Sequence, residues 1–197
     1  MNISFDHVFV FFDIPKSAST SIDQALRPIS QLRIAGRGGI KHCDVKDYEE
    51  YVEPFLARRL GITVYDFERM AVVREPVDML WSLYRYLRRA GVEDPGHHDH
   101  EKYTGYVSFD EFCLTVCGQR LSADHKWGAP RASNFAADSE GVIKIDSLFA
   151  FDKLDGLTDY VLRRFGKTVN IPTLNSTNRG EITLSKSVRH VVQENFK

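Results

Sequence analysis

Apolar runs along the chain predict the strands of a buried sheet. Val8 to Phe12 and Met70 to Val73 contain no polar residue, and such unbroken runs are typical of strands buried on both faces of a parallel sheet. Val142 to Ile145 predicts a third strand. The sheet is therefore expected to combine segments that lie far apart in the sequence.

Apolar residues at helical spacing lie between and after these runs. Asp44 is the predicted N-cap of one helix, and Pro54 is expected to kink or divide that helix. Its apolar stripe comprises Val45, Tyr48, Val52, Phe55 and Leu56. Further helices are predicted through 22–26, from residue 76, and over 108–117, 157–165 and 184–196.

The composition is that of a globular protein. The chain has 197 residues, of which 43% are hydrophobic and 12% aromatic, so we expect one domain over residues 1–197 with a single core. The formal net charge of −1 disfavours a protein that coats nucleic acid, because binding to the phosphate backbone needs a basic excess. The cysteines, Cys43, Cys113 and Cys117, are odd in number and form no C-x-x-C pair, so we expect them to be reduced.

The N-terminal segment carries no pattern for export or membrane insertion. It lacks a basic stretch, and its apolar run over 8–12 is far shorter than the roughly 18 residues that suggest a membrane-spanning helix. We therefore expect a cytoplasmic protein without a membrane span.

A hydroxyl-rich turn follows the first predicted strand. Pro15 ends the strand and Lys16 provides a cation. The candidate N-caps of the next helix are Ser17, Ser19, Thr20 and Ser21. Free N–H groups and the positive end of a helix then converge beside Lys16, which predicts an anion site. The segment has no glycine, so it is not the G-x-x-x-x-G-K-[ST] loop of NTPases. A serine-rich helix cap with a solvated lysine is the alternative interpretation.

The segment Ile14-Pro15-Lys16-Ser17-Ala18-Ser19-Thr20-Ser21 resembles the 5′-phosphosulfate loop of sulfotransferases that depend on PAPS, 3′-phosphoadenosine 5′-phosphosulfate. The family pattern is Pro-Lys-x-x-x-Thr-[Ser/Thr], and the serine-rich segment is most similar to the carbohydrate branch of the family. Many animal members of that branch carry an N-terminal membrane anchor, so the resemblance implies a bacterial or otherwise cytoplasmic member, or a trimmed catalytic domain. The resemblance implies that Lys16, Ser17, Ala18, Ser19, Thr20 and Ser21 bind the phosphosulfate group. It also implies that Lys16 takes part in catalysis.

A second motif begins at Arg74. This residue follows the predicted strand at Met70 to Val73 and precedes a helix start at Pro76, so it is expected at the sheet edge where α/β folds bind ligands. Arg-x-Pro followed by Ser82 resembles the family signature for the 3′-phosphate of PAPS, which implies that Arg74 and Ser82 bind that phosphate together. Glu75 departs from the asparagine common in the family. The alternative is an Arg–Glu surface pair ahead of an amphipathic helix.

His42 is the predicted general base. It lies just before the helix capped by Asp44, and a helix N-terminus favours the neutral, proton-accepting imidazole. The pair Lys41-His42 resembles a pair found at a similar distance after the phosphosulfate loop in the family, where a histidine of related enzymes deprotonates the acceptor hydroxyl. The alternative is a histidine that only caps or packs against the helix.

Later loops carry further polar residues. The loop over 174–181 resembles one that closes the nucleotide site in the family, which implies that Arg179 and Gly180 contact the nucleotide. Arg131 stands where the family has glutamine and points to a negatively charged acceptor, with an irregular surface loop as the alternative. The histidines of 97–100 have no second ligand cluster of metal-binding spacing, so we predict a solvated loop and no metal site.

The resemblance covers nearly the whole chain and implies both a fold and a reaction. The fold is α/β with three layers, a mostly parallel sheet flanked by helices, as in P-loop kinase-like sulfotransferases. The reaction is transfer of a sulfuryl group from PAPS to a hydroxyl of a small-molecule or glycan acceptor, with PAP as the product and no metal required. Two other functions stay open: a nucleotide-dependent kinase with a degenerate phosphate loop, and a non-catalytic nucleotide-binding module.

Overall fold

The computed structural model of the chain describes residues 1–36, 38–61, 67–119, 127–174 and 181–196. The chain divides into two compact units, the first formed by Met1–Arg74 and Pro130–Ser176 and the second by Glu75–Ala129 and Thr177–Lys197. Each unit is described by itself below. That residues 1–197 act as one domain stays a prediction.

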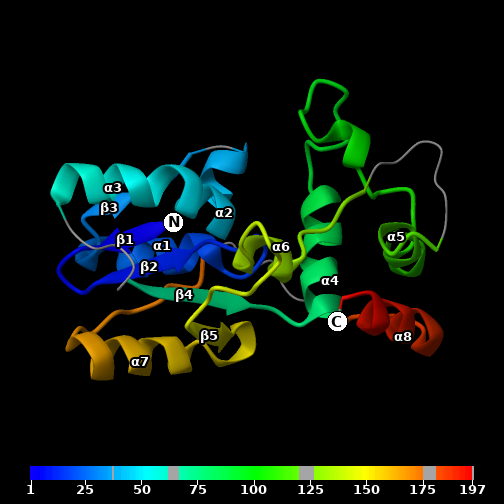
Figure 1. The fold of residues 1–197 in the computed structure, drawn as a ribbon. Helices are drawn as coiled ribbons and strands as arrows, with labels where there is room; N and C mark the ends of the chain where they lie inside the picture. Colours follow the sequence, from blue (N-terminus) through cyan, green and yellow to red (C-terminus); the bar gives the residue numbers. More distant parts are fainter. Residues whose placement is uncertain (37, 62–66, 120–126, 175–180, 197) are drawn as a thin grey trace. The chain divides into compact units, whose positions relative to one another are not determined.

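The first unit is built on a mixed sheet. Its strands are β1 (Asn2–Ser4), β2 (Phe9–Phe12), β3 (Leu32–Arg33), β4 (Glu68–Val73) and β5 (Ser147–Ala150). They lie in the order β3-β1-β2-β4-β5 (Figure 1). β2, β4 and β5 pair in parallel, and β1 pairs antiparallel with both β2 and β3. Only β1 therefore runs against the others, which confirms the predicted α/β fold with a mostly parallel sheet.

Helices cover both faces of this sheet. The helical elements of the unit include α1 (Ser19–Leu26), α2 (Val45–Asp47), η3 (Tyr48–Val52), α3 (Glu53–Leu60), α6 (Ala132–Ala136) and α7 (Asp155–Phe165). Val10 and Phe12 of β2 belong to a core cluster with α2, η3 and α3. Phe9 and Phe11 belong to another cluster, with α1 and α7. Because neither face of β2 meets water, this strand needs no polar alternation, and three layers result.

The strand predicted over Val142 to Ile145 is wrong. The Asp138 carboxylate accepts hydrogen bonds from the N–H groups of Glu140 and Val142, both at 2.9 Å, and these bonds turn the chain. Ile143 makes an isolated bridge to Ala137 rather than joining the sheet. The strand beside β4 is β5, an edge strand whose residues alternate between half-buried and exposed. An edge strand of this kind has no unbroken apolar run, so the search for such runs placed the third strand at the wrong residues.

The helical stretch after Asp44 is interrupted by a π-helical turn, η3. Pro54 follows this turn closely, and since proline has no N–H group to continue the α-helical ladder, it divides the stretch as expected. The wider turn shifts the phase of the next residues. Phe55 is therefore 56% exposed while Glu53 is only 7% exposed, which corrects the predicted apolar stripe at Phe55.

Asp44 caps this stretch as predicted, and its removal tests the cap. Asp44 Oδ1 accepts the N–H of Asp47 at 2.9 Å, and Asp47 Oδ2 accepts the N–H of Asp44 at 3.4 Å. Asp44→Ala is expected to lower the free energy of unfolding by about 1 kcal/mol, measured by urea denaturation. Asp44→Asn is the matched control, because asparagine caps about equally well. Equal losses in both variants would contradict the cap.

The second unit is helical. It contains α4 (Pro76–Leu87), η5 (His100–Lys102), α5 (Phe109–Val116) and α8 (Lys186–Asn195) (Figure 1). Its core joins α4, α5 and α8 and includes Leu80, Phe112 and Val192. Ser108 caps α5, its hydroxyl oxygen accepting the N–H of Glu111 at 3.2 Å. Cys113 lies on the buried face of that helix, and Cys117, its C-cap residue, is also buried.

Candidate functional site

The predicted anion loop lies at the carboxyl ends of β2 and β4. These strands pair in parallel, with Phe12 opposite Ala71, so the chain leaves both of them at the same edge of the sheet. Residues 13–18 follow β2 and Arg74 follows β4. This edge is the place where open α/β sheets bind ligands.

The backbone of the loop is strained at two residues. Lys16 and Ala18 have φ angles of 65° and 59°, a left-handed conformation that is uncommon for residues other than glycine. Such strain persists where the surrounding fold enforces it, often at functional sites. The loop therefore makes its turns without the glycines of the NTPase loop.

The start of α1 leaves amide groups without partners inside the helix. Ala18 is the N-cap residue, so the prediction that serine or threonine caps this helix is wrong: a methyl group accepts no hydrogen bond. The first helical bond runs from Ile22 N–H to Ala18 O at 3.1 Å. The N–H groups of residues 19–21 precede it and have no intrahelical acceptor. They provide donors for an anion, at the positive end of the helix dipole.

The hydroxyl groups of the loop differ in their surroundings. Ser17, Ser19 and Ser21 are buried, whereas Thr20 is exposed. Ser21 Oγ accepts the N–H of Leu174 at 3.2 Å, so this hydroxyl fastens the segment after α7 to α1.

Arg74 joins the two predicted motifs. Its Nη1 donates to the carbonyl oxygen of Lys16 at 3.0 Å. Its guanidinium lies 4.0 Å from the centroid of the Phe151 ring, in cation–π contact. Phe151 and the Lys16 carbonyl thus hold the guanidinium at the loop. Phe151 is a residue that sequence reasoning missed, because its contact with Arg74 is tertiary.

His42 has the proton arrangement of a base. Its Nδ1 lies 2.6 Å from Asp13 O, and since a carbonyl oxygen only accepts, Nδ1 carries the proton. In the neutral ring Nε2 is then the proton acceptor. Burial lowers the pKa of His42 below 6.5, and the ammonium of Lys41 lowers it further. The neutral form is favoured as predicted, but the first cause is burial rather than the following helix.

Asp13, whose carbonyl oxygen accepts the His42 proton, is itself held by an ion pair. Its side chain is buried, and Oδ2 lies 2.6 Å from the amino group of Met1. Burial raises the pKa of Asp13, and the Met1 amino group opposes this rise. The ion pair fixes the segment whose carbonyl orients His42.

Lys41 is a second cation at the loop. Its Nζ donates to Thr20 Oγ1 at 2.9 Å, which brings η2 (Gly38–His42) to the start of α1. Sequence reasoning identified Lys41 only as the neighbour of His42, because nothing in the pattern places η2 beside Thr20. An ammonium at this position adds positive charge to the predicted anion site.

Comparison with known families decides the class of the protein. The model of the Sulfotransferase family matches residues 1–196. The chain belongs to the sulfotransferase family. No curated protein and no solved structure matches the chain in the corresponding searches.

Two further residues of this sulfotransferase lie in its second unit. Ser82 is half-buried in the second turn of α4. Glu75 caps that helix, its carboxylate accepting the N–H of Asp78 at 2.8 Å. That Arg74 and Ser82 bind one phosphate stays a prediction. Arg179 and Gly180 lie outside the described residues.

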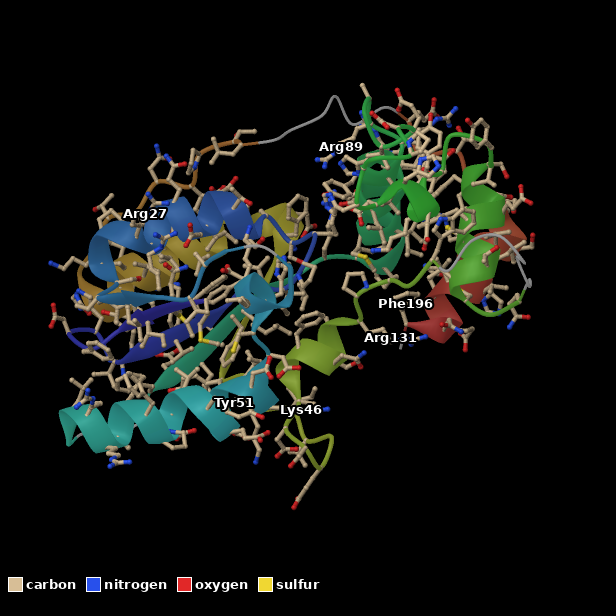
Figure 2. The ribbon with its side chains drawn as sticks, turned by 90° about the horizontal axis from the view of Figure 1, so that it is seen from above. Arg27, Lys46, Tyr51, Arg89, Arg131 and Phe196 are labelled. Carbon is tan, nitrogen blue, oxygen red and sulfur yellow. The ribbon has the colours of Figure 1, made fainter. Side chains whose placement is uncertain are left out.

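The remaining predicted loops carry no established role in this sulfotransferase. Arg131 is the N-cap residue of α6 (Figure 2). His97, His98 and Asp99 have ligand atoms within 4.8 Å of one another, but Asp99 Oδ1 already accepts Lys102 Nζ at 3.0 Å. Within the described ranges, no helix has the length and apolar character to cross a membrane.

Proposed function

We propose that this sulfotransferase transfers a sulfuryl group from PAPS to a hydroxyl of a carbohydrate or glycoconjugate, acting as one cytoplasmic domain over residues 1–197. The observation that carries the proposal is the hydrogen bond from Arg74 Nη1 to Lys16 O at 3.0 Å. It joins residues of the two motifs, one for each phosphate-bearing end of the donor, at a single edge of the sheet.

The residues at this edge suit a doubly phosphorylated donor. The 5′-phosphosulfate would lie on Lys16, Ser17, Ala18, Ser19, Thr20 and Ser21. Amide donors at the start of α1 and the ammonium of Lys16 match its charge. Arg74, with Ser82, would bind the 3′-phosphate, and Arg179 and Gly180 would close the nucleotide site.

Bound PAPS supplies a sulfuryl group attached to a phosphate leaving group. Transfer of this group to a hydroxyl requires no metal. Lys16 and the amides of residues 19–21 stabilise the charge that grows on the leaving phosphate oxygen. Lys41, which donates to Thr20 Oγ1 at 2.9 Å, adds to this stabilisation with a second positive charge. His42 Nε2 takes the proton of the acceptor hydroxyl.

Arg74 contributes binding energy away from the reacting atoms. Contacts to a remote phosphate orient the donor and make the reaction effectively intramolecular. Since the guanidinium is held by Lys16 O and by the Phe151 ring, it is already placed before the donor arrives.

Loss of the Phe151 ring is expected to weaken PAP binding through Arg74. Phe151→Leu removes a cation–π contact at 4.0 Å worth about 0.5–1 kcal/mol, so the Kd for PAP is expected to rise roughly two- to fivefold, measured by calorimetry. Phe151→Tyr keeps an aromatic face and serves as the control. The contact has no such role if the leucine variant binds PAP as tightly as the tyrosine variant.

Transfer of labelled sulfate from PAPS to a panel of glycans tests the proposal. We expect a labelled glycan and PAP as products, with turnover unchanged by EDTA. A kinase with a degenerate loop would instead transfer phosphate from ATP and lose activity with EDTA. A non-catalytic module would bind nucleotide without turnover, and either result would contradict the proposal.

A further inference from the structure

A groove in the second unit lies outside the residues assigned above. It has a volume of about 610 Å³ and is formed by α4, α5 and the segment before α8. Pockets for small organic ligands have volumes of about 300–1,000 Å³. The groove is thus large enough for a ligand of that class.

Three aromatic side chains line this groove in mutual contact. The rings of Trp81 and Tyr84 are stacked with centroids 5.6 Å apart, and Trp81 meets Phe109 edge-on at 4.9 Å. Phe109 and Tyr84 are buried, whereas Trp81 is half-buried. The cluster provides a rigid apolar wall with the indole at its accessible part.

A guanidinium is fixed at the same groove. Arg88 Nη1 donates to the hydroxyl of Tyr84 at 2.7 Å, and that hydroxyl donates to Val107 O at 2.8 Å. The Tyr84 hydroxyl therefore has both an acceptor for its proton and a donor for its oxygen within the unit. Arg88 is anchored through one nitrogen while its side chain stays exposed, so it offers further donors in a fixed orientation.

A carboxylate complements this guanidinium. Asp110 lies in the first turn of α5 and accepts the N–H of Ser185 through Oδ1 at 3.2 Å. This bond fixes the carboxylate at the groove. The two charged groups cancel in formal charge, and they present donors and acceptors beside an aromatic wall.

We propose that this groove binds a neutral disaccharide unit of the acceptor. Pyranose rings carry an apolar C–H face that suits an indole and a rim of hydroxyls that both donate and accept, as Asp110 and Arg88 require. A lipid chain would leave both charges unpaired. A nucleotide would bring phosphates against Asp110. That the disaccharide belongs to the acceptor rests on the proposed function.

Titration of neutral disaccharides into the whole chain tests this assignment. Lactose, cellobiose and chitobiose are the probes, with binding measured by calorimetry or saturation-transfer NMR at up to about 10 mM ligand. At least one probe is expected to bind. Arg88→Gln is expected to weaken that binding at least about tenfold, as loss of a hydrogen bond to a charged group does. Trp81→Ala is also expected to weaken it at least about tenfold, because the sugar loses the apolar face of the indole.

Arg89→Gln is the matched control for Arg88→Gln. Arg89 is the next residue and is also exposed (Figure 2), but it contacts Tyr86, with Nη2 donating to that hydroxyl at 3.1 Å, and does not line the groove. It should leave sugar affinity unchanged. Absence of binding by every probe, or equal affinities in Arg88→Gln and Arg89→Gln, would overturn the assignment.

PAP titration of the same samples separates the two proposals. PAP binding without any disaccharide binding would overturn the assignment of the groove as a disaccharide site, while the proposed function would stand. Disaccharide binding that depends on Arg88, in a protein that does not bind PAP, would support the groove and overturn the proposed function.

Discussion

Replacing Lys16 by methionine is expected to lower kcat by about 100- to 1,000-fold, because the ammonium stabilises charge that grows on the leaving phosphate oxygen in the transition state and is absent from that oxygen in bound PAPS. Methionine has an unbranched side chain of similar length and no charge. The variant is measured by steady-state transfer of labelled sulfate, with PAP affinity determined separately. A larger loss in kcat than in PAP affinity identifies Lys16 as a catalytic group rather than a binding group.

Two lysine variants serve as comparisons for Lys16. Lys41→Met removes the ammonium that donates to Thr20 Oγ1 at 2.9 Å, and an intermediate loss of about tenfold in kcat is expected. Lys46 is exposed on α2 (Figure 2), and Lys46→Met should leave kcat unchanged. Equal activity of the Lys16 and Lys46 variants would remove Lys16 from the mechanism.

Replacing His42 by alanine is expected to lower kcat by about 100- to 10,000-fold while PAP affinity stays within about twofold, since a general base acts only on the acceptor proton. The variant is measured with the same transfer assay and with PAP calorimetry. His190→Ala is the control, because His190 is exposed on α8 of the second unit. Undiminished turnover of His42→Ala would show that another group takes the proton.

The pH dependence of kcat follows from the lowered pKa of His42. Only the neutral ring is a base, so activity falls as the pH drops through the His42 pKa. Burial places that pKa below 6.5, so kcat should be flat near neutral pH and decline only in the acidic range. The wild-type acidic limb should disappear from the residual activity of His42→Ala. An acidic limb above pH 6.5 would contradict the buried, neutral histidine.

Local patterns predicted the parts of the site that depend on neighbouring residues. The unbroken apolar run before Pro15 predicted a strand covered on both faces, and Pro76 predicted the start of the helix after Arg74. Lys16 and Arg74 were therefore both predicted to lie just after the ends of strands. These features follow from burial and from the covalent geometry of proline.

The errors arise where tertiary context overrides the pattern. The serine-rich turn predicted a hydroxyl cap, yet the left-handed backbone at Ala18 puts a methyl group in that position. β1 and β3 have three and two residues, too few to show a period. Lys41 and Phe151 reach the site only through folding of distant segments. No single-sequence pattern encodes such contacts.

The most direct measurement of the central claim is calorimetric titration of the chain with PAP and, separately, with ATP and Mg²⁺. The account predicts that PAP binds more tightly than ATP–Mg²⁺ and that Arg74→Ala weakens PAP binding by about 10- to 100-fold, the cost of losing a charged hydrogen-bonding group to phosphate. A preference for ATP–Mg²⁺, or PAP binding unchanged by Arg74→Ala, would contradict it.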